Sequence, residues 1–242
     1  MEDLQKLLKN LKNVEIMNKI LVIAAHPDDE VLGMGGTIAK LAGSGDEVYV
    51  LIVTDGSSSQ YSGAADLQKI IEDKKQETWA CAQTLGVKDV YYGELPDMKL
   101  DTTPHIEINK VIEKLVDQLK PNIVYTHFWG DVNMDHQCVY KSTLVAVRPV
   151  MGQVVKELYC YRVPSSTEWT PCKADTMFMP NVFVDITAEA ERKYEAFGKY
   201  STELREYPHP RSIQHLKELD VARGLEVGQG PTETFVLLRK LS

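Results

Sequence analysis

Short apolar segments alternate with longer amphipathic segments along most of the chain. Residues 21–25 read Leu-Val-Ile-Ala-Ala and are followed closely by Pro27, a pattern typical of a buried parallel strand. Similar apolar segments predict further strands at 48–53, 90–92 and 123–126. Apolar residues at helical spacing predict helices at 31–41, 66–84, 106–119 and 137–147. This alternation predicts right-handed βαβ crossovers and a mostly parallel sheet that is covered on both faces.

The last third of the chain has a different pattern. It predicts strands at 158–163, 181–186 and 235–238, and helices at 188–202 and 212–223. A long polar loop at 164–171 contains a tryptophan and suits the wall of a pocket. We therefore expect an α/β fold, a Rossmann-like three-layer sandwich with a mostly parallel sheet and a smaller C-terminal α+β extension.

The N-terminal segment has a pattern of its own. Residues 3–17 place leucines and a valine at helical spacing, with lysines on other faces. We expect residues 1–18 to form an amphipathic helix, packed on the domain or on another subunit of a homo-oligomer. Residues 19–242 are expected to form a single domain.

Composition narrows the classes of partner. The 242 residues are 43% hydrophobic, enough to bury a full core, and their formal net charge of −8 offers no basic field for nucleic acid. No apolar stretch approaches the ~18 residues of a membrane span, so membrane insertion is not expected. Four cysteines without CxxC spacing indicate core residues in a reducing compartment, and a cytoplasmic protein is the default expectation.

An imidazole and three carboxylates follow the first strand, in the sequence His26-Pro27-Asp28-Asp29-Glu30. Adjacent acids repel one another unless a cation offsets their charge, and ligands bind beyond the carboxyl ends of parallel strands. His26 and Asp29 are close enough to turn toward one point. The loop after 123–126 ends at His136, the best third ligand. Two imidazoles and one carboxylate suit a hydrolytic Zn²⁺, although Fe²⁺ also accepts them.

These segments resemble the PIG-L/LmbE-like family of metal-dependent N-deacetylases, whose signature is a first strand running into Ala-His-Pro-Asp-Asp-Glu. The similarity continues in Lys74-Lys75-Gln76-Glu77, in Leu95-Pro96-Asp97, in Asn133-Met134-Asp135-His136 and in His209-Pro210-Arg211-Ser212. The resemblance implies that His26, Asp29 and His136 hold zinc and that Asp28 is the general base. It also implies a small N-acetylated sugar of the N-acetylglucosamine type, or a soluble conjugate of one, as substrate.

Two positions depart from the family pattern. Asn133 stands where many relatives carry a histidine that stabilises the oxyanion, so the leaving amine would take its proton from Asp28 or from another histidine, for which His209 is the candidate. Lys74 replaces an arginine expected to contact substrate hydroxyls, and a point charge orients them less strictly than a planar fork.

Other side chains have expected roles around this centre. Asp135 is expected to orient a ligand imidazole, or else to cap the following helix. Lys74 and Asp97 are expected to bind substrate, and Trp129 to stack on a sugar ring or to lie partly buried in the core. His127 is either a core residue or an alternative ligand.

Two other functions remain open from the sequence. The chain could be an amidase for a non-sugar N-acyl small molecule, a choice that the loop at 164–171 would decide. It could also be a non-catalytic metal- or nucleotide-binding module. Gly33-Met34-Gly35-Gly36 lacks the GxGxxG spacing and follows an acidic loop, which counts against a dinucleotide.

Overall fold

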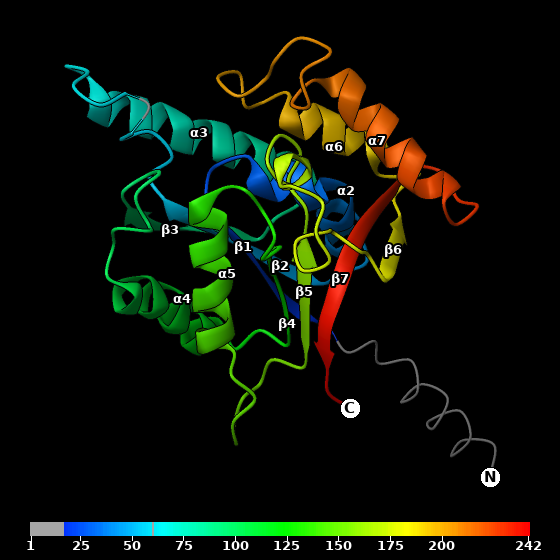
Figure 1. Cartoon of the computed structure of the whole chain (residues 1–242), viewed down its shortest axis with the longest axis horizontal. Coiled ribbons are helices and arrows are strands. Elements are labelled where there is room, and N and C mark those ends of the chain that lie inside the picture. Colours follow the sequence, from blue (N-terminus) through cyan, green and yellow to red (C-terminus); the bar gives the residue numbers. More distant parts are fainter. Residues whose placement is uncertain (1–16, 60) are drawn as a thin grey trace, which may run out of the picture.

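The computed structural model describes residues 17–59 and 61–242, so the amphipathic helix expected at the N-terminus lies outside the described residues. The strands form one sheet in the order β3-β2-β1-β4-β5-β7-β6 (Figure 1). Their bounds are β1 Lys19–Ala24, β2 Glu47–Thr54, β3 Asp89–Leu95, β4 Ile123–His127, β5 Glu157–Tyr161, β6 Val182–Asp185 and β7 Thr232–Lys240.

The sheet is parallel over its first five strands and antiparallel at one side. β1 pairs in parallel with both β2 and β4, and β4 pairs in parallel with β5. β7 runs antiparallel to both β5 and β6. The expected α/β class, with a mostly parallel sheet and a C-terminal α+β part, is therefore confirmed.

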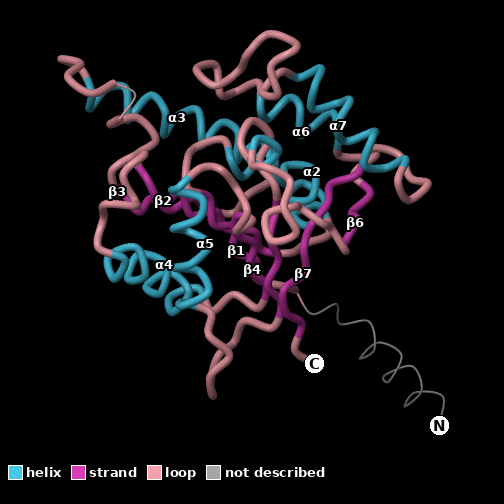
Figure 2. The backbone as a smooth tube through the Cα atoms, in the orientation of Figure 1, coloured by secondary structure: helices cyan, strands magenta, loops and turns pink. Residues whose placement is uncertain are grey.

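Helices cover both faces of the sheet (Figure 2). Their bounds are α2 Asp29–Gly43, α3 Leu67–Leu85, α4 His105–Leu119, α5 Met134–Ala146, α6 Ala190–Phe197 and α7 Ile213–Leu225, with a short 3₁₀ turn η1 at Thr167–Trp169. The alternation of side chains along β1 divides the core in two. Ile20 and Val22 join a cluster with α2, α3, α6 and α7, whereas Leu21 and Ile23 join one with α4 and α5.

Two helix ends differ from the sequence expectation. The helix expected at 188–202 ends at Phe197, because Gly198 and the following turns lead the chain away from the helix axis. The helix expected at 137–147 begins three residues earlier, because the side chain of Asn133 accepts a hydrogen bond from the backbone N–H of Asp135.

The strand order reverses between β1 and β4, and this reversal places the loops that carry chemistry. Successive strands run outward from β1 to β2 and β3, and the chain then returns to add β4 on the other side of β1. The loops that leave β1 and β4 therefore flank one crevice, where open α/β sheets bind ligands. Within the described residues, no helix is long and apolar enough to cross a membrane.

Candidate active site

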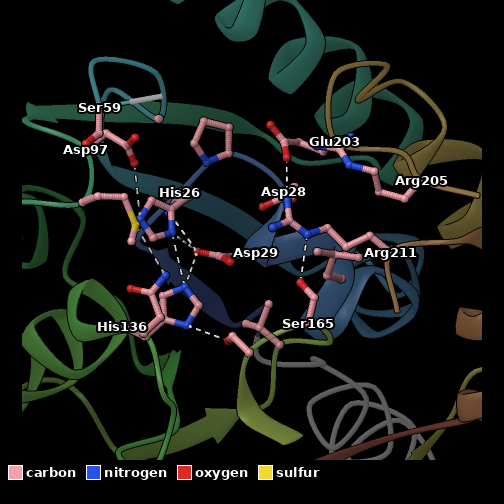
Figure 3. Close-up of a pocket in the computed structure, with 17 residues that line it drawn as sticks. His26, Asp28, Asp29, Ser59, Asp97, His136, Ser165, Glu203, Arg205 and Arg211 are labelled. Carbon is pink, nitrogen blue, oxygen red and sulfur yellow. Dashed lines mark hydrogen bonds and ion pairs between the residues drawn. The ribbon is translucent and has the colours of Figure 1, made fainter. Parts of the chain in front are cut away.

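A cavity of about 460 Å³ opens at this crevice (Figure 3). That volume lies within the range of about 300–1,000 Å³ typical of small-molecule sites. The loop after β1 and the first turn of α2 contribute one wall of the cavity. The loops after β2, β3 and β5, the N-terminus of α5 and the loop between α6 and α7 contribute the others.

Three atoms from this lining form a nearly equilateral triangle. His26 Nδ1 lies 3.2 Å from His136 Nε2, and each of these nitrogens lies 3.3 Å from Asp29 Oδ2. Tetrahedral zinc with bonds of about 2.0–2.1 Å separates neighbouring ligand atoms by about 3.3 Å. The three donors therefore have the spacing that one small divalent cation requires.

Hydrogen bonds on the outer side of each imidazole set its orientation. His26 Nε2 lies 3.1 Å from Asp135 Oδ2, and His136 Nδ1 lies 3.1 Å from Asp131 Oδ2. A carboxylate only accepts, so each outer nitrogen carries a proton, and in the neutral imidazole that binds a metal the inner nitrogen presents its lone pair. Asp135 is fixed in turn by the backbone N–H groups of Met98 and Leu100, at 2.8 Å and 3.0 Å.

The charges at this centre favour a cation. Burial alone would lower the pKa of His136, but the carboxylates of Asp29 and Asp131 outweigh it and raise that pKa to about 9. In the same way, Asp135 and Asp29 outweigh burial at His26 and raise its pKa well above the ordinary value. Acidic groups therefore make the point between the two imidazoles strongly attractive to positive charge.

Asp28 adjoins this triangle and has an unusual backbone. It is the N-cap residue of α2, and its φ of 112° lies in the left-handed region that side chains rarely adopt. Glu30 Oε2 accepts the backbone N–H of Asp28 at 3.1 Å, and Tyr200 donates its hydroxyl to Glu30 Oε1 at 2.6 Å. Glu30, which the sequence left without a role, therefore supports the strained turn.

The side chain of Asp28 faces the cavity beside Arg211 (Figure 3). Asp28 Oδ2 lies 3.3 Å from Arg211 Nη1. Burial raises the pKa of Asp28 well above its ordinary value, and the guanidinium of Arg211 opposes that increase. A carboxylate with a raised pKa, next to a cation site, is suited to exchanging protons.

Two more of the expected residues line the cavity. Asn133 uses its side-chain oxygen to cap α5, and its amide nitrogen donates to Met98 Sδ at 3.7 Å, which leaves one of its two N–H groups to face the cavity. Asp97 is almost fully buried, and its Oδ1 lies 3.5 Å from His26 Nε2. The structure therefore brings Asn133 and Asp97 into the same cavity as the triangle of donors.

Lys74 and Trp129 do not line the cavity. The ammonium of Lys74 is buried and lies 2.6 Å from Glu203 Oε1. The indole of Trp129 packs against Phe128 and donates to the backbone oxygen of Asp175 at 2.7 Å. The structure gives both residues contacts within the protein, and the substrate contact expected of each stays a prediction.

The two remaining histidines near the site also point elsewhere. His209 is outside the cavity lining, and its Nδ1 accepts the backbone N–H of Arg211 at 3.0 Å. His127 is fully buried, and its Nε2 accepts the backbone N–H of Ala25 at 2.8 Å. That hydrogen bond occupies the lone pair of His127, so the structure favours the core role over the ligand role.

Sequence reasoning missed three polar residues that the structure places at the site. Asp131 binds His136 and accepts hydroxyl hydrogen bonds from Ser166 and Thr167, each at 2.7 Å. Arg211 and Glu203 come from the loop between α6 and α7 and line the cavity. The motif around Arg211 was visible in the sequence, but nothing local to it indicated a contact with Asp28.

Comparisons with known proteins identify the family of this chain. The family model described as GlcNAc-PI de-N-acetylase (PIG-L) matches residues 21–147. A protein of Escherichia coli K12 named uncharacterized deacetylase YaiS is 30% identical over 178 residues, which cover 70% of this chain and 83% of that protein.

Similarity to two further proteins extends over most of the chain. The 1D-myo-inositol 2-acetamido-2-deoxy-alpha-D-glucopyranoside deacetylase of Mycolicibacterium vanbaalenii is 25% identical over 263 residues, covering 90% of each chain. The structure of N,N'-diacetylchitobiose deacetylase from Pyrococcus horikoshii superposes with a TM-score of 0.73 at 22% identity, covering 98% of this chain and 92% of that one. The family match over half of the chain and the similarity to YaiS place the chain in the GlcNAc-PI de-N-acetylase (PIG-L) family.

Proposed function

We propose that this chain is a metal-dependent N-deacetylase that removes the acetyl group from an N-acetylglucosamine-type sugar or a soluble conjugate of one. The observation that carries the proposal is the triangle of His26, Asp29 and His136 with the carboxylate of Asp28 facing the same cavity. Two of the similar proteins are named as deacetylases of 2-acetamido sugars, which supports this substrate class.

We assign the metal to His26 Nδ1, Asp29 Oδ2 and His136 Nε2. Zinc is the metal we propose, with iron(II) as the second choice, because two imidazoles and one carboxylate suit both. When bound, the metal supplies Lewis-acid polarisation of the amide carbonyl and activates water. Asp131 and Asp135 hold the two imidazoles in the orientation that presents their lone pairs.

Asp28 handles the protons in the proposed reaction. Its neighbour Asp29 is one of the three proposed metal donors. The Asp28 carboxylate is not, so it can accept a proton from the attacking water. The water oxygen bonds to the carbonyl carbon, the C–N bond then breaks, and the amine nitrogen leaves with the proton from Asp28. Acetate and the free amino sugar are the products, and no other proton donor is required.

Asn133 and Asp97 are assigned to the substrate. The amide nitrogen of Asn133 donates one N–H to Met98 Sδ, and its second N–H is assigned to the oxyanion that develops on the carbonyl. The Asp97 carboxylate lies at the cavity wall and is suited to accept a hydrogen bond from a sugar hydroxyl.

The single-domain organisation of residues 19–242 and the homo-oligomer stay predictions. Light scattering of the full chain tests the oligomer.

An assay of amine release tests the proposed function. The metal-loaded protein is incubated with N-acetylglucosamine, N,N'-diacetylchitobiose and an N-acetylglucosamine glycoside, and with N-acetylated amino acids as non-sugar substrates. We expect release of acetate and free amine from the sugars, and a fall in kcat of roughly 100- to 10,000-fold in Asp28→Asn. Metal analysis is expected to give the same metal content in both proteins.

Asp117→Asn is the matched control, because Asp117 is an exposed residue of α4 paired only with Lys120. This variant is expected to keep the wild-type rate. If only the N-acetylated amino acids release amine, the substrate is a non-sugar N-acyl compound and not a sugar. Wild-type rates in Asp28→Asn would refute the mechanism.

A further inference from the structure

Arg211 has a fixed position at the cavity wall, set by three side chains. Its Nη1 lies 3.3 Å from Asp28 Oδ2 and also donates to Glu203 Oε2, while its Nε donates to Ser165 Oγ at 2.8 Å. Arg205 lines the same cavity, but its Nη1 donates only to backbone oxygens of the neighbouring loop. Arg211 is therefore the arginine whose geometry depends on Asp28.

A line of alternating charges extends from Arg211 into the protein. Glu203 divides its carboxylate between two cations, with Oε2 on Arg211 and Oε1 on the buried ammonium of Lys74, 2.6 Å away. Lys74 belongs to α3, whereas Asp28 caps α2. Glu203 and Arg211 thus each lie between two partners of the opposite sign, with Lys74 and Asp28 at the ends of the series. These contacts fix long side chains that would otherwise sample many rotamers.

We propose that Arg211 is a positioning residue for Asp28, and that Glu203 and Lys74 act through it. The planar guanidinium contacts Oδ2 of the Asp28 carboxylate and restricts how that side chain turns in the cavity that it lines. Arginine suits this place because its fork reaches Asp28, Glu203 and Ser165 at once, which a lysine ammonium at the end of a flexible stem does not. The kinetic test of this role rests on the proposed function. A second test depends only on the position of the Asp28 carboxylate.

The kinetic test is Arg211→Ala on the metal-loaded full chain. We expect kcat to fall roughly 10- to 100-fold, as with other residues that orient a catalytic group, with a smaller change in KM. Added guanidinium ion should restore kcat saturably, because it fills the space that the side chain vacates. Arg211→Lys should lie between Arg211→Ala and wild type. Arg192→Ala, an exposed residue of α6, should keep the wild-type kcat and show no response to guanidinium.

A double-mutant cycle separates positioning from general destabilisation. Residues that act through one group lose their separate effects when that group is gone. Arg211→Ala should therefore cost little further activity in Asp28→Asn, and Glu203→Gln and Lys74→Met should lower kcat in the wild-type background only. Equal losses in both backgrounds, or a wild-type kcat in Arg211→Ala, would overturn the proposal.

Crystal structures of wild type and Arg211→Ala test the same inference without turnover. The Asp28 carboxylate is expected to rotate or lose order in the variant, and an unchanged, ordered carboxylate would contradict the positioning role. If the wild type releases no amine from any N-acetylated sugar, the proposed function fails while this structural comparison still decides the role of Arg211.

Discussion

At the scale of single residues, the conformation of Asp28 is the feature that most constrains the site. Its left-handed backbone aims the side chain into the cavity, while Asp29, one residue later, points at the two imidazoles of the triangle. A non-glycine residue held in such a conformation costs of order 1–3 kcal/mol. The hydrogen bond from the Asp28 N–H to Glu30, itself held by Tyr200, offsets part of that cost.

This strain predicts an unusual order of stability among Asp28 variants. Asp28→Gly should be more stable than Asp28→Ala by about 1 kcal/mol in free energy of unfolding, because glycine adopts a positive φ without penalty and is also the better N-cap. Both variants lose the same carboxylate, so their difference reports on the backbone. Urea denaturation of the two proteins measures it.

Lys110 provides the matched control, since it is exposed in the interior of α4. There the order should reverse, with the glycine variant less stable than the alanine variant by about 1 kcal/mol. If alanine and glycine are equally stable at position 28, the strain assigned to that turn is absent.

The same scale shows what a sequence can and cannot reveal about the site. His26, Asp29 and His136 could be predicted because a strand end or a loop after a strand carries each, and parallel strands bring their ends to one edge. The contact between Arg211 and Asp28 joins residues 183 positions apart, and no local pattern encodes it. Lys74 was expected at the substrate for its place in a motif, and that motif does not indicate its buried contact with Glu203.

At the scale of elements, the start of α2 depends on a buried polar cluster behind it. The helix is kinked at Met34, and the backbone N–H groups of Gly36 and Thr37 donate to the carboxylate of Glu233 at 3.0 Å and 2.6 Å. A Cβ at Gly36 would lie only 2.6 Å from Ile186 Cδ1. The glycine-rich segment thus serves close packing and a second helix cap.

Lys193 neutralises this cluster, and its loss should be costly. Its ammonium is buried and lies 2.9 Å from both carboxylate oxygens of Asp220 and 2.9 Å from Glu233. Lys193→Met keeps the length of the side chain but leaves two buried carboxylates without their cation. We expect a loss of about 3–5 kcal/mol in free energy of unfolding, measured by urea denaturation.

Lys217→Met is the control for that measurement. Lys217 is paired with Glu191 at 3.0 Å across the same two helices, but 44% of the Lys217 side chain and 82% of the Glu191 side chain are exposed. Its loss should cost at most about 1 kcal/mol. Equal costs for the two lysines would show that the buried cluster contributes no more than a surface pair.

The elements themselves followed the hydrophobic pattern closely where it was strong. The apolar strands β1, β2 and β4 and the regular helix α4 lie within two residues of their expected bounds, because burial on the sheet dictates those patterns. Helix α6 is shorter than its pattern predicted. A continuing apolar spacing cannot distinguish a helix from the packed turns of residues 198–204, which bury Tyr200 beside Glu30.

At the scale of the whole molecule, the site joins the two layers of helices that the sheet otherwise separates. His26 and Asp29 lie where β1 meets α2, on the side of the sheet that packs against α3, α6 and α7. His136 lies on α5, which covers the opposite face with α4. A cation bound to all three would link the two layers of helices across the edge of the sheet.

Metal binding should therefore stabilise the chain as a whole. A ligand that binds only the folded state adds about 2.7 kcal/mol at 100 times its Kd, because the unfolded chain lacks the assembled donors. We expect removal of the metal by a chelator to lower the melting temperature and to abolish amine release, and both should return when zinc is restored. Calorimetry across a series of zinc concentrations measures the shift.

Two histidine variants make this measurement specific to the proposed centre. His136→Ala removes one donor of the triangle and should remove the zinc-dependent increase in melting temperature. His105→Ala changes an exposed histidine at the start of α4 and should keep the increase. An equal zinc-dependent shift in both variants would show that His136 does not hold the stabilising zinc. The metal would then lie elsewhere on the chain and would not link the two layers through this triangle.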